Sequence, residues 1–367
     1  NGAAGFNAAK AVRERDRTGA VILISDEPYP AYNRPMLTKS IVAGLSAEQI
    51  AIEGPDWYEE NRVYQMLGKK AVSVDMKEKE VILEDGAKVH FTKLIYALGS
   101  ECFIPPMEGS SLPEVVAIRR LADVEKTERL MKEASDAVVI GGGVLGLEAA
   151  WELKKAGLNV KVLEVAPVLM GRQLDAGSAE LLKKIALKNG VEIRTGVTVE
   201  AIEGKEHVTG VRLSGGEVCP ADLVIVSAGV RANIGLAQSI GLDTDRAVLV
   251  NEHMETNLPD VYACGDCAQY RGANFAIWPE AVEQGKTAGA NAAGEKAVYE
   301  PVAAALTFHG MNTALFAAGD NGKNPNLLYK TVEFQDMGKG QFRKCYFLNN
   351  RLCGVILIGD LSEMAKM

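Results

Sequence analysis

Hydrophobic and polar residues follow two different periods along residues 136–165, DAVVIGGGVLGLEAAWELKKAGLNVKVLEV. The apolar run at residues 137–140 predicts a short buried strand. Residues 147–156 carry apolar side chains at helical spacing, and Gly157 is a typical end for such a helix. The segment NVKVLE that follows predicts a second strand. The pattern therefore predicts a strand–helix–strand unit of a parallel sheet.

The turn between the first strand and the helix has the spacing G-x-G-x-x-G. Its glycines permit a tight turn, the approach of a pyrophosphate to the helix N-terminus, and close packing of helix on strand. Glu164 ends the second strand, 18 residues after Gly146, where an acid accepts hydrogen bonds from a ribose 2′-hydroxyl. We therefore expect a dinucleotide to contact Gly141, Gly143, Val144, Leu145, Gly146 and Glu164.

Glu164 also bears on which dinucleotide binds. A carboxylate about 4 Å from a 2′-phosphate would cost about 4 kcal/mol at an effective dielectric constant near 20. Val165, and not an arginine, follows Glu164. The sequence therefore favours NADH over NADPH.

The beginning of the chain repeats this pattern. Gly2 and Gly5 stand where the second and third glycines would be, and a helix and an apolar strand follow. Either Asp26 or Glu27, directly after that strand, is expected to contact a ribose. The first strand and first glycine of this copy would lie before Asn1. Two dinucleotide folds imply two dinucleotides, and FAD is the natural electron acceptor for NADH.

Composition narrows the class of protein. A length of 367 residues suggests two or three domains, and 47% hydrophobic with 24% charged residues is ordinary for a globular protein. The net charge of −8 argues against nucleic-acid binding. Six cysteines are too few for a disulfide framework, so we expect a cytoplasmic protein. No apolar run reaches the length of about 18 residues that a membrane helix needs.

Three further segments complete a family signature. Residues 92–100 (TKLIYALGS), 221–233 (ADLVIVSAGVRAN) and 256–268 (TNLPDVYACGDCA) resemble motifs of the pyridine nucleotide–disulfide oxidoreductase superfamily. The resemblance implies an α/β fold with two Rossmann-like three-layer ββα domains and a small α+β C-terminal domain. The expected boundaries are 1–103 with 229–298 for FAD, 104–228 for NADH, and 299–367 for the C-terminal interface domain.

One segment narrows the branch of this superfamily. Residues 27–44 (EPYPAYNRPMLTKSIVAG) resemble the Y-x-R-P-x-L-S-K segment of ferredoxin, rubredoxin and nitrite reductase flavoproteins. The disulfide reductases have a redox cysteine in this region, whereas residues 33–44 contain none. Residues 299–367 also resemble the C-terminal domain of the rubredoxin and nitrite reductase flavoproteins.

The resemblance assigns individual residues to the cofactors. Gly229 is added to the NADH contacts. Glu148 is a candidate neighbour of the nicotinamide, or else a helix-surface carboxylate, and Trp278 either covers the flavin ring or is a core aromatic. No side chain is expected to be an obligatory acid or base. The expected FAD contacts are Gly2, Gly5, Asp26, Glu27, Arg34, Lys39, Val72, Ala97, Gly99, Arg119, Gly265, Asp266, Trp278 and Gly285.

The stretch YACGDCAQY places Cys264 and Cys267 in C-x-x-C spacing. They could form a redox dithiol or half of a metal site, but their position in a cofactor motif favours small core residues on either side of Asp266. A zinc site with Cys345 and Cys353 is not expected. A two-residue turn at Asn349-Asn350 would pair Tyr346 with Cys353 and Cys345 with Gly354, so that the two cysteines point to opposite faces.

These features together indicate a flavoprotein that takes hydride from NADH onto FAD and passes electrons to a small iron–sulfur partner, namely rubredoxin, ferredoxin or a nitrite reductase module. Three alternatives stay open: an NADH oxidase or peroxidase, a coenzyme A or persulfide-type disulfide reductase, and a redox-sensing interaction protein that binds FAD and NADH. The protein is expected to be a monomer or a homodimer, with no bound metal and no membrane or nucleic-acid partner.

Overall fold

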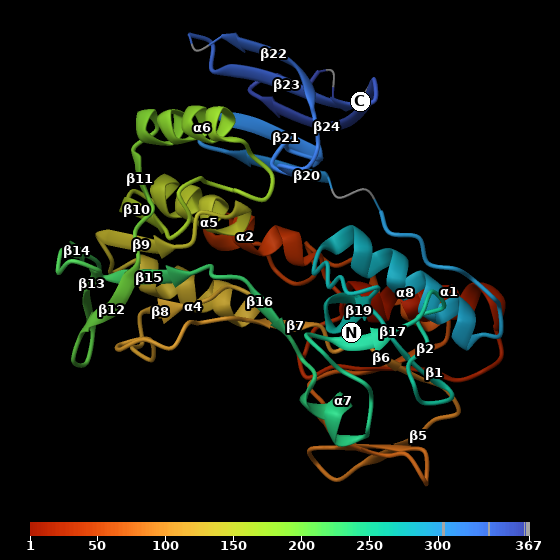
Figure 1. Ribbon diagram of the computed structural model, residues 1–367. Helices are drawn as coiled ribbons and strands as arrows, with labels where there is room; N and C mark the ends of the chain where they lie inside the picture. Colours follow the sequence, from red (N-terminus) through yellow and green to blue (C-terminus); the bar gives the residue numbers. More distant parts are fainter. Residues whose placement is uncertain (303–304, 337, 363, 365–367) are drawn as a thin grey trace. The chain divides into compact units, whose positions relative to one another are not determined.

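The chain divides into two compact units. The computed structural model describes residues 1–302, 305–336, 338–362 and 364 (Figure 1). Unit 1 comprises Asn1–Met36, Leu45–Glu101 and Val230–Val302, and unit 2 comprises Leu37–Gly44, Cys102–Gly229 and Ala303–Met367. Each unit is therefore assembled from segments that are distant in the sequence.

Unit 1 contains short parallel strand pairs and one antiparallel sheet. The parallel pairs are β1–β2, β18–β6 and β17–β19, and β3, β4 and β5 form the antiparallel sheet. Its elements are α1 (Ala3–Arg15), β1 (Val21–Ile24), η1 (Arg34–Met36), α3 (Pro55–Glu60), β2 (Val63–Met66), β3 (Ala71–Asp75), β4 (Glu80–Leu83), β5 (Lys88–His90), β6 (Leu94–Tyr96), β7 (Ser100–Cys102), β16 (Val230–Ala232), α7 (Gly235–Ser239), β17 (Val248–Val250), β18 (Val261–Ala263), η2 (Gly265–Cys267), β19 (Ala268–Tyr270) and α8 (Trp278–Ala292).

Unit 2 contains a parallel sheet in the order β11-β10-β9-β15-β8 and an antiparallel sheet of β12, β13 and β14. Its elements up to Gly229 are α2 (Leu37–Ala43), β8 (Val115–Val116), α4 (Leu121–Met131), β9 (Asp136–Ile140), α5 (Val144–Lys155), β10 (Asn159–Glu164), α6 (Ala176–Lys188), β11 (Val191–Thr195), β12 (Val199–Gly204), β13 (Val208–Leu213), β14 (Val218–Pro220) and β15 (Leu223–Val226). The predicted unit at 136–165 is confirmed as β9, α5 and β10, with the helix beginning three residues before the periodic segment.

The two units repeat the same succession of elements. Helix α1, strands β1 and β2, the β3–β5 sheet and β6 follow the order of α5, β10, β11, the β12–β14 sheet and β15. In unit 2, β9 lies between β10 and β15 and joins them into one sheet. In unit 1, the corresponding pairs β1–β2 and β18–β6 are separate sheets.

Helices α1 and α8 pack side by side at a distance that only glycine permits (Figure 1). A Cβ added to Gly285 would lie 2.3 Å from the carbonyl oxygen of Ala4, and one added to Gly289 would lie 2.1 Å from that of Ala8. Both distances are shorter than any van der Waals contact, so these glycines set the approach of the two backbones.

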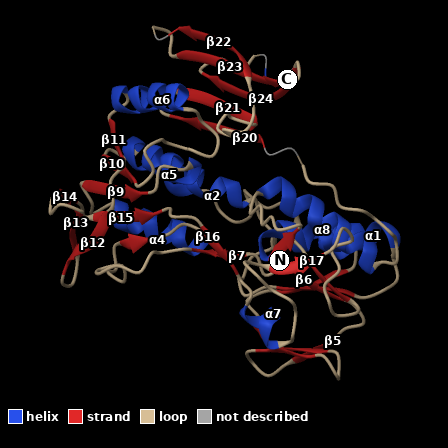
Figure 2. Ribbon diagram, viewed as in Figure 1, coloured by secondary structure: helices blue, strands red, loops and turns tan. Residues whose placement is uncertain are grey.

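The C-terminal part of unit 2 is a twisted antiparallel sheet in the order β20-β21-β24-β23-β22, drawn as strands in Figure 2. Its strands are β20 (Ala305–Gly310), β21 (Thr313–Gly319), β22 (Lys330–Asp336), β23 (Gln341–Leu348) and β24 (Arg351–Ile358). Asn349 and Asn350 have φ angles of +50° and +62°, which confirms the two-residue turn.

The predicted pairing beyond this turn is wrong by one residue. A β-bulge opposite Tyr346 and Phe347 leaves Cys353 of β24 as the extra residue, so that Tyr346 pairs with Gly354 and Cys345 with Val355. The physical reason lies outside the hairpin. A Cβ at position 354 would come within 1.7 Å of the carbonyl oxygen of Asp320, so this register places a glycine where a side chain could not fit.

The packing of α1 on α8 predicts opposite effects of two Gly-to-Ala substitutions. Alanine normally stabilises a helix relative to glycine. We expect Gly289→Ala instead to lower the free energy of unfolding by about 1–3 kcal/mol, because the new methyl group meets the backbone of α1. The control Gly235→Ala, in helix α7 with no atom within 4 Å of the added Cβ, should be neutral or slightly stabilising. Thermal unfolding of both variants tests this, and equal Tm values would contradict it.

Candidate functional site

In the glycine motif at the start of α5, contacts with backbone carbonyls require Gly141 and Gly146 but not Gly143. Gly141 has a φ of +116°, and an added Cβ would lie 2.2 Å from the carbonyl oxygen of Ser227. A Cβ on Gly146 would lie 2.1 Å from the carbonyl oxygen of Gly141. Gly143 has a φ of −78° and no heavy atom within 4 Å of an added Cβ. Its missing side chain leaves open space at the start of the helix, which fits the close approach of a ligand.

The helices that follow the two glycine motifs begin without side-chain caps. The N-cap residues of α1 and α5, Gly2 and Gly143, make no side-chain capping hydrogen bond, and neither helix has an acidic residue in its first turn. By contrast, Asp175 accepts a hydrogen bond from the Ser178 N–H at the start of α6, and Asp123 accepts from backbone N–H groups at the start of α4. The N–H groups at the starts of α1 and α5 are thus suited to an anionic ligand such as a phosphate.

The Glu164 carboxylate is hydrogen-bonded to the backbone of the glycine-rich turn that precedes α5. Its Oε2 accepts a hydrogen bond of 2.6 Å from the Gly142 N–H, and its Oε1 accepts one of 2.7 Å from the Ala166 N–H. Each oxygen retains a lone pair for a further donor. The predicted acid is therefore fixed beside the glycine turn.

Glu148 is buried, so its interpretation as a helix-surface carboxylate is wrong. Its exposed fraction is 6%, because α2 covers this face of α5. The Thr38 hydroxyl donates a hydrogen bond of 2.8 Å to one carboxylate oxygen, and Lys39 Nζ lies 3.8 Å from the other. Burial raises the pKa of Glu148 despite the opposing effects of Thr38 and Lys39.

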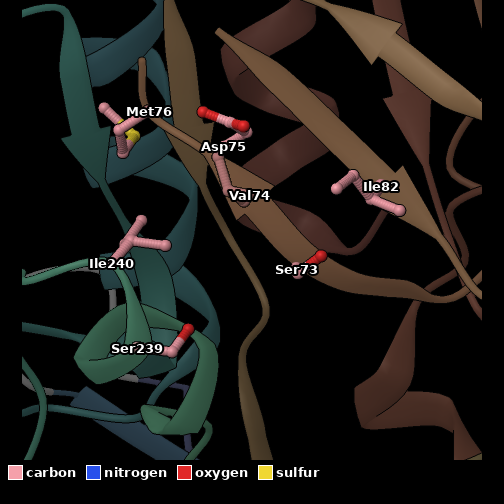
Figure 3. Close-up of a pocket in the computed structure, with 7 residues that line it drawn as sticks. All are labelled: Ser73, Val74, Asp75, Met76, Ile82, Ser239 and Ile240. Carbon is pink, nitrogen blue, oxygen red and sulfur yellow. The ribbon is translucent and has the colours of Figure 1, made fainter. Parts of the chain in front are cut away.

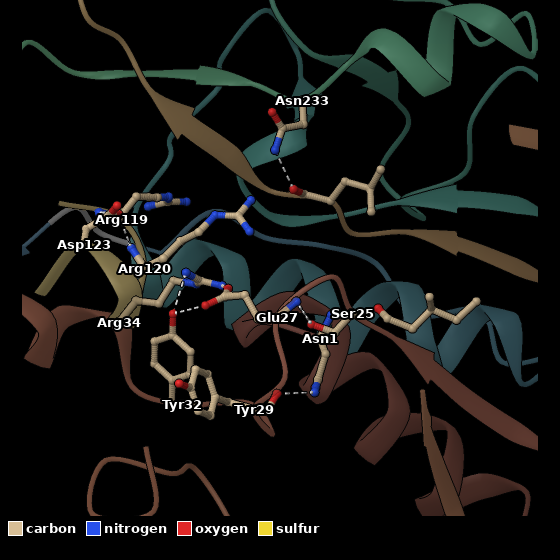
Figure 4. Close-up of polar contacts among 12 residues, drawn as sticks. Asn1, Ser25, Glu27, Tyr29, Tyr32, Arg34, Arg119, Arg120, Asp123 and Asn233 are labelled. Carbon is tan, nitrogen blue, oxygen red and sulfur yellow. Dashed lines mark hydrogen bonds and ion pairs between the residues drawn. The ribbon is translucent and has the colours of Figure 1, made fainter. Parts of the chain in front are cut away.

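In unit 1, Glu27 and Arg34 lie together after β1 (Figure 4). Glu27 is buried and accepts hydrogen bonds from the Tyr32 hydroxyl, at 2.7 Å, and from the Arg34 guanidinium. The guanidinium also lies 4.8 Å from the centre of the Tyr32 ring. Asp26 is exposed. Glu27, one of the two predicted acids, is therefore joined to the predicted basic residue Arg34.

The turn at η2 is fixed by contacts with several parts of unit 1. Gly265 has a φ of +80°, an added Cβ would lie 2.7 Å from the Ala4 Cβ, and its N–H donates to Gln284. Asp266 accepts a hydrogen bond of 2.8 Å from the Ser100 hydroxyl. The predicted flavin-contacting acid thus has a fixed orientation near the start of α1.

Cys264 and Cys267 are fully buried and form no disulfide, and the Cys267 thiol donates a hydrogen bond of 3.3 Å to the carbonyl of Cys264. Burial raises the pKa of the Cys264 thiol well above its ordinary value and that of Cys267 to about 12. Both are therefore protonated at neutral pH, which disfavours a dithiol relay because thiolates are the reactive form. Within the described ranges, no three His, Cys, Asp or Glu side chains form a group that could hold a metal ion.

The remaining predicted residues lie at the ends of elements. Asn233 donates a hydrogen bond of 2.9 Å to the carbonyl of Leu98 and so holds the turn after β6 that contains Ala97 and Gly99 (Figure 4). Trp278 is half-buried at the start of α8 beside a core cluster. The others are placed as follows: Val72 exposed on β3, Val144 and Leu145 at the start of α5, Gly229 exposed before β16, and Arg119 before α4 with its N–H donating to Asp123.

The sequence interpretation missed the hydroxyl groups that orient the predicted carboxylates. Thr38, Ser100 and Tyr32 donate to Glu148, Asp266 and Glu27, respectively. Thr38 and Ser100 lie more than a hundred residues from their acceptors, so no local pattern indicates these contacts. Only the proximity of Thr38 to the predicted Lys39 in the segment LTKS could have suggested one of them.

A separate hollow of about 480 Å³ lies in unit 1 between β3 and α7 (Figure 3). Its lining is mixed, with apolar side chains such as Ile82 and Ile240 beside Asp75 and two serines. None of the seven residues that line it is a predicted cofactor contact.

Comparison with known proteins places the chain in a family. Residues 1–285 match the model of the pyridine nucleotide-disulphide oxidoreductase family. The chain belongs to this family of NAD(P)H-dependent oxidoreductases. Residues 305–367 match the rubredoxin NAD+ reductase C-terminal domain. The family and the branch predicted from the sequence are confirmed.

The curated relatives include proteins of different lengths. The chain is 33% identical to the nitrite reductase [NAD(P)H] of Bacillus subtilis over 99% of its own length, but it covers only 45% of that protein. It spans about half of this relative and of the assimilatory nitrate reductase electron transfer subunit of the same organism, where it covers 48%. It covers 91% of the NADH-rubredoxin oxidoreductase of Clostridium acetobutylicum, at 29% identity.

Solved structures confirm the fold class. A ferredoxin reductase from Rhodopseudomonas palustris matches 99% of the chain with a TM-score of 0.90 at 25% identity, over 91% of that protein. A covalent putidaredoxin reductase–putidaredoxin complex matches the whole chain with a TM-score of 0.88 at 26% identity, over 89% of the reductase chain. No helix within the described residues is both long and apolar enough to cross a bilayer.

The environment of Glu148 predicts a pH-dependent contribution to stability. Because its folded-state pKa is raised, this contribution is fully present below the ordinary value of 4.5 and is lost as pH rises through the raised pKa. Glu148→Gln removes the ionisation and keeps an acceptor for Thr38. The Tm of the variant relative to wild type should therefore rise as the pH increases above 4.5. The control Glu180→Gln, on the exposed face of α6, should show little pH trend, and a flat difference for Glu148→Gln would contradict the prediction.

Proposed function

We propose that this chain is an NADH-dependent FAD reductase that passes electrons to a small iron–sulfur protein. The observation that carries the proposal is the paired arrangement of glycine motifs and uncapped helix starts at α1 and α5. When bound, NADH supplies a hydride and FAD accepts it and releases the electrons to the partner. The protein residues bind and orient the two dinucleotides.

Unit 2 supplies the residues proposed for NADH. The open space at Gly143 admits the pyrophosphate to the N–H groups of α5, and Glu164 accepts a hydrogen bond from the adenosine ribose. The fixed Glu164 carboxylate repels a 2′-phosphate, which favours NADH over NADPH. Val144, Leu145 and Gly229 lie at exposed or half-exposed positions and complete the proposed contacts.

Unit 1 supplies most of the residues proposed for FAD. The N–H groups at the start of α1 would bind the pyrophosphate, and Asp26 or Glu27, the latter paired with Arg34, would contact the ribose. Asp266, oriented by Ser100, would accept a hydrogen bond from a ribityl hydroxyl. With this assignment we also propose the FAD-domain boundaries expected from the sequence, residues 1–103 and 229–298.

The proposed acceptor follows from the relatives and from the cysteines. Relatives of the chain include an NADH-rubredoxin oxidoreductase and a rubredoxin-NAD(+) reductase. The segment 33–44 has no cysteine, and burial keeps Cys264 and Cys267 protonated. We therefore propose that electrons leave the flavin for a partner protein, and not for a cysteine thiol of residues 33–44 or of the η2 turn.

A second candidate is an NADH oxidase that reduces oxygen directly. An NADH oxidase from Methanocaldococcus jannaschii is 33% identical over 87% of the chain, and the chain covers 73% of it. The acceptor assay below separates the two candidates.

The proposed function is tested by anaerobic titration of the full-length protein with NADH, followed in the visible spectrum. We expect a yellow protein that bleaches with one NADH per FAD and is reduced much less efficiently by NADPH. Reoxidation by rubredoxin or ferredoxin should be faster than by oxygen. A protein that cannot take up FAD would overturn the proposal, and faster reoxidation by oxygen would favour the oxidase.

The η2 turn predicts that substitution of Asp266 and substitution of the two cysteines have different effects. Asp266→Ala removes a charged acceptor for FAD, and we expect the Kd of FAD to rise about 10- to 100-fold. The double variant Cys264→Ala with Cys267→Ala should keep FAD binding and NADH–acceptor activity. Equilibrium dialysis and steady-state assays measure both. An inactive double variant that still holds FAD would restore the dithiol hypothesis.

A further inference from the structure

The segment 165–175 connects Glu164 to helix α6 and lies against the glycine-rich turn. The Met170 N–H donates to the carbonyl of Gly142 at 3.2 Å, and Leu169 is buried where a Cβ on Gly142 would meet it at 2.6 Å. Glu164 binds the N–H of the same Gly142. The 165–175 segment and the turn therefore form one continuous surface beside the proposed adenosine site.

The C-terminal sheet holds this segment from the other side through backbone carbonyls. Between β21 and β22, Lys323 Nζ donates to the carbonyl of Gly171, and Asn321 Nδ2 donates to that of Arg172 at 3.2 Å. The same Asn321 amide lies 3.5 Å from the carbonyl of Leu174. Neither Asn321 nor Lys323 belongs to the glycine motif or to its strands.

The end of the segment is held by side chains of β23. Lys344 Nζ and the Tyr346 hydroxyl donate to one oxygen of Asp175, at 2.7 and 2.8 Å. The other Asp175 oxygen caps α6 through the Ser178 N–H at 2.9 Å. Burial acts to raise the pKa of Asp175, but the hydrogen bonds from Lys344, Ser178 and Tyr346 outweigh it and set the pKa at about 2.

The loop that carries Asn321 and Lys323 is itself packed on the C-terminal sheet. The Asp320 N–H donates to the carbonyl of Cys353 at 2.9 Å, and Gly354 packs against the Asp320 backbone. A Cβ on Gly322 would lie 2.5 Å from the Tyr346 ring. The donors of Asn321 and Lys323 therefore come from a loop with little freedom to move away from the strands.

We propose that Asn321 and Lys323 are positioning residues for the adenosine half of NADH. They act through the 165–175 segment, which they hold so that Gly142 and Glu164 keep the geometry that the dinucleotide needs. An ordered segment binds its ligand at a smaller cost in conformational entropy than a free one. The inference rests on the proposed function, because it assigns the C-terminal sheet a role in the same NADH site.

The test uses the double variant Asn321→Ala with Lys323→Ala in the full-length, FAD-loaded protein. Calorimetry measures the Kd of ADP-ribose, which contains the adenosine, the pyrophosphate and the second ribose but lacks the nicotinamide ring. Steady-state assays compare NADH with reduced nicotinamide mononucleotide, which lacks the adenosine side. We expect the Kd of ADP-ribose and the KM for NADH to rise about three- to tenfold. The kcat at saturating NADH, the KM for the mononucleotide and the FAD content should stay at wild-type values.

Two controls sharpen the result. Lys330→Ala removes an exposed lysine of the same sheet whose Nζ contacts Asn350 and not the segment, and it should match wild type. Lys323→Gln keeps a donor, and in an otherwise wild-type chain it should weaken ADP-ribose binding less than Lys323→Ala does.

Three outcomes would overturn the inference. An unchanged Kd of ADP-ribose in the double variant would show that the contacts do not act on the site. An equal rise of KM for NADH and for the mononucleotide would show a general structural defect. A wild-type protein that binds no ADP-ribose would instead remove the NADH site of the proposed function, and the inference with it.

Discussion

Close contact between backbones at glycine positions is the constraint on which both units depend. In unit 2, Gly146 lies against the Gly141 carbonyl and Gly141 against the Ser227 carbonyl, so α5 starts directly at the ends of β9 and β15. In unit 1, Gly285 and Gly289 bring α8 onto the backbone of α1. Side chains of any size would push these helices away. The helix starts, with their uncapped N–H groups, are thus fixed in place by packing that no other residue allows.

Gly143 differs from these glycines because the protein itself makes no use of its missing side chain. Its φ angle suits any residue, and the space beside it is open. A glycine that neither conformation nor packing requires is what a ligand close to the backbone would need, and this fits the proposed dinucleotide site. The same turn carries the fixed carboxylate of Glu164, so that the geometry offers N–H donors for a phosphate beside an acceptor for a hydroxyl group.

The parts of the molecule that could be predicted from the sequence are those set by local patterns. Strand β9, helix α5 and strand β10 follow from periodicity and turn chemistry within 30 residues, and the Asn349-Asn350 turn from its two residues alone. The parts that could not be predicted depend on distant segments. The bulge in β24 places Gly354 against the backbone of Asp320. Glu148 is buried because it packs against α2, whose Thr38 lies 110 residues away in the sequence. Similarly, no local pattern indicates that Glu27 is bound by Tyr32 and Arg34.

The central claim is that one chain holds two different dinucleotides at the same time, one at each glycine motif. Native mass spectrometry of the full-length protein in the presence of FAD and NAD+ tests this most directly. The account predicts a species whose mass exceeds that of the polypeptide by one FAD and one NAD+. A protein that binds either dinucleotide alone but never both together would contradict it, because the two ligands would then share one site.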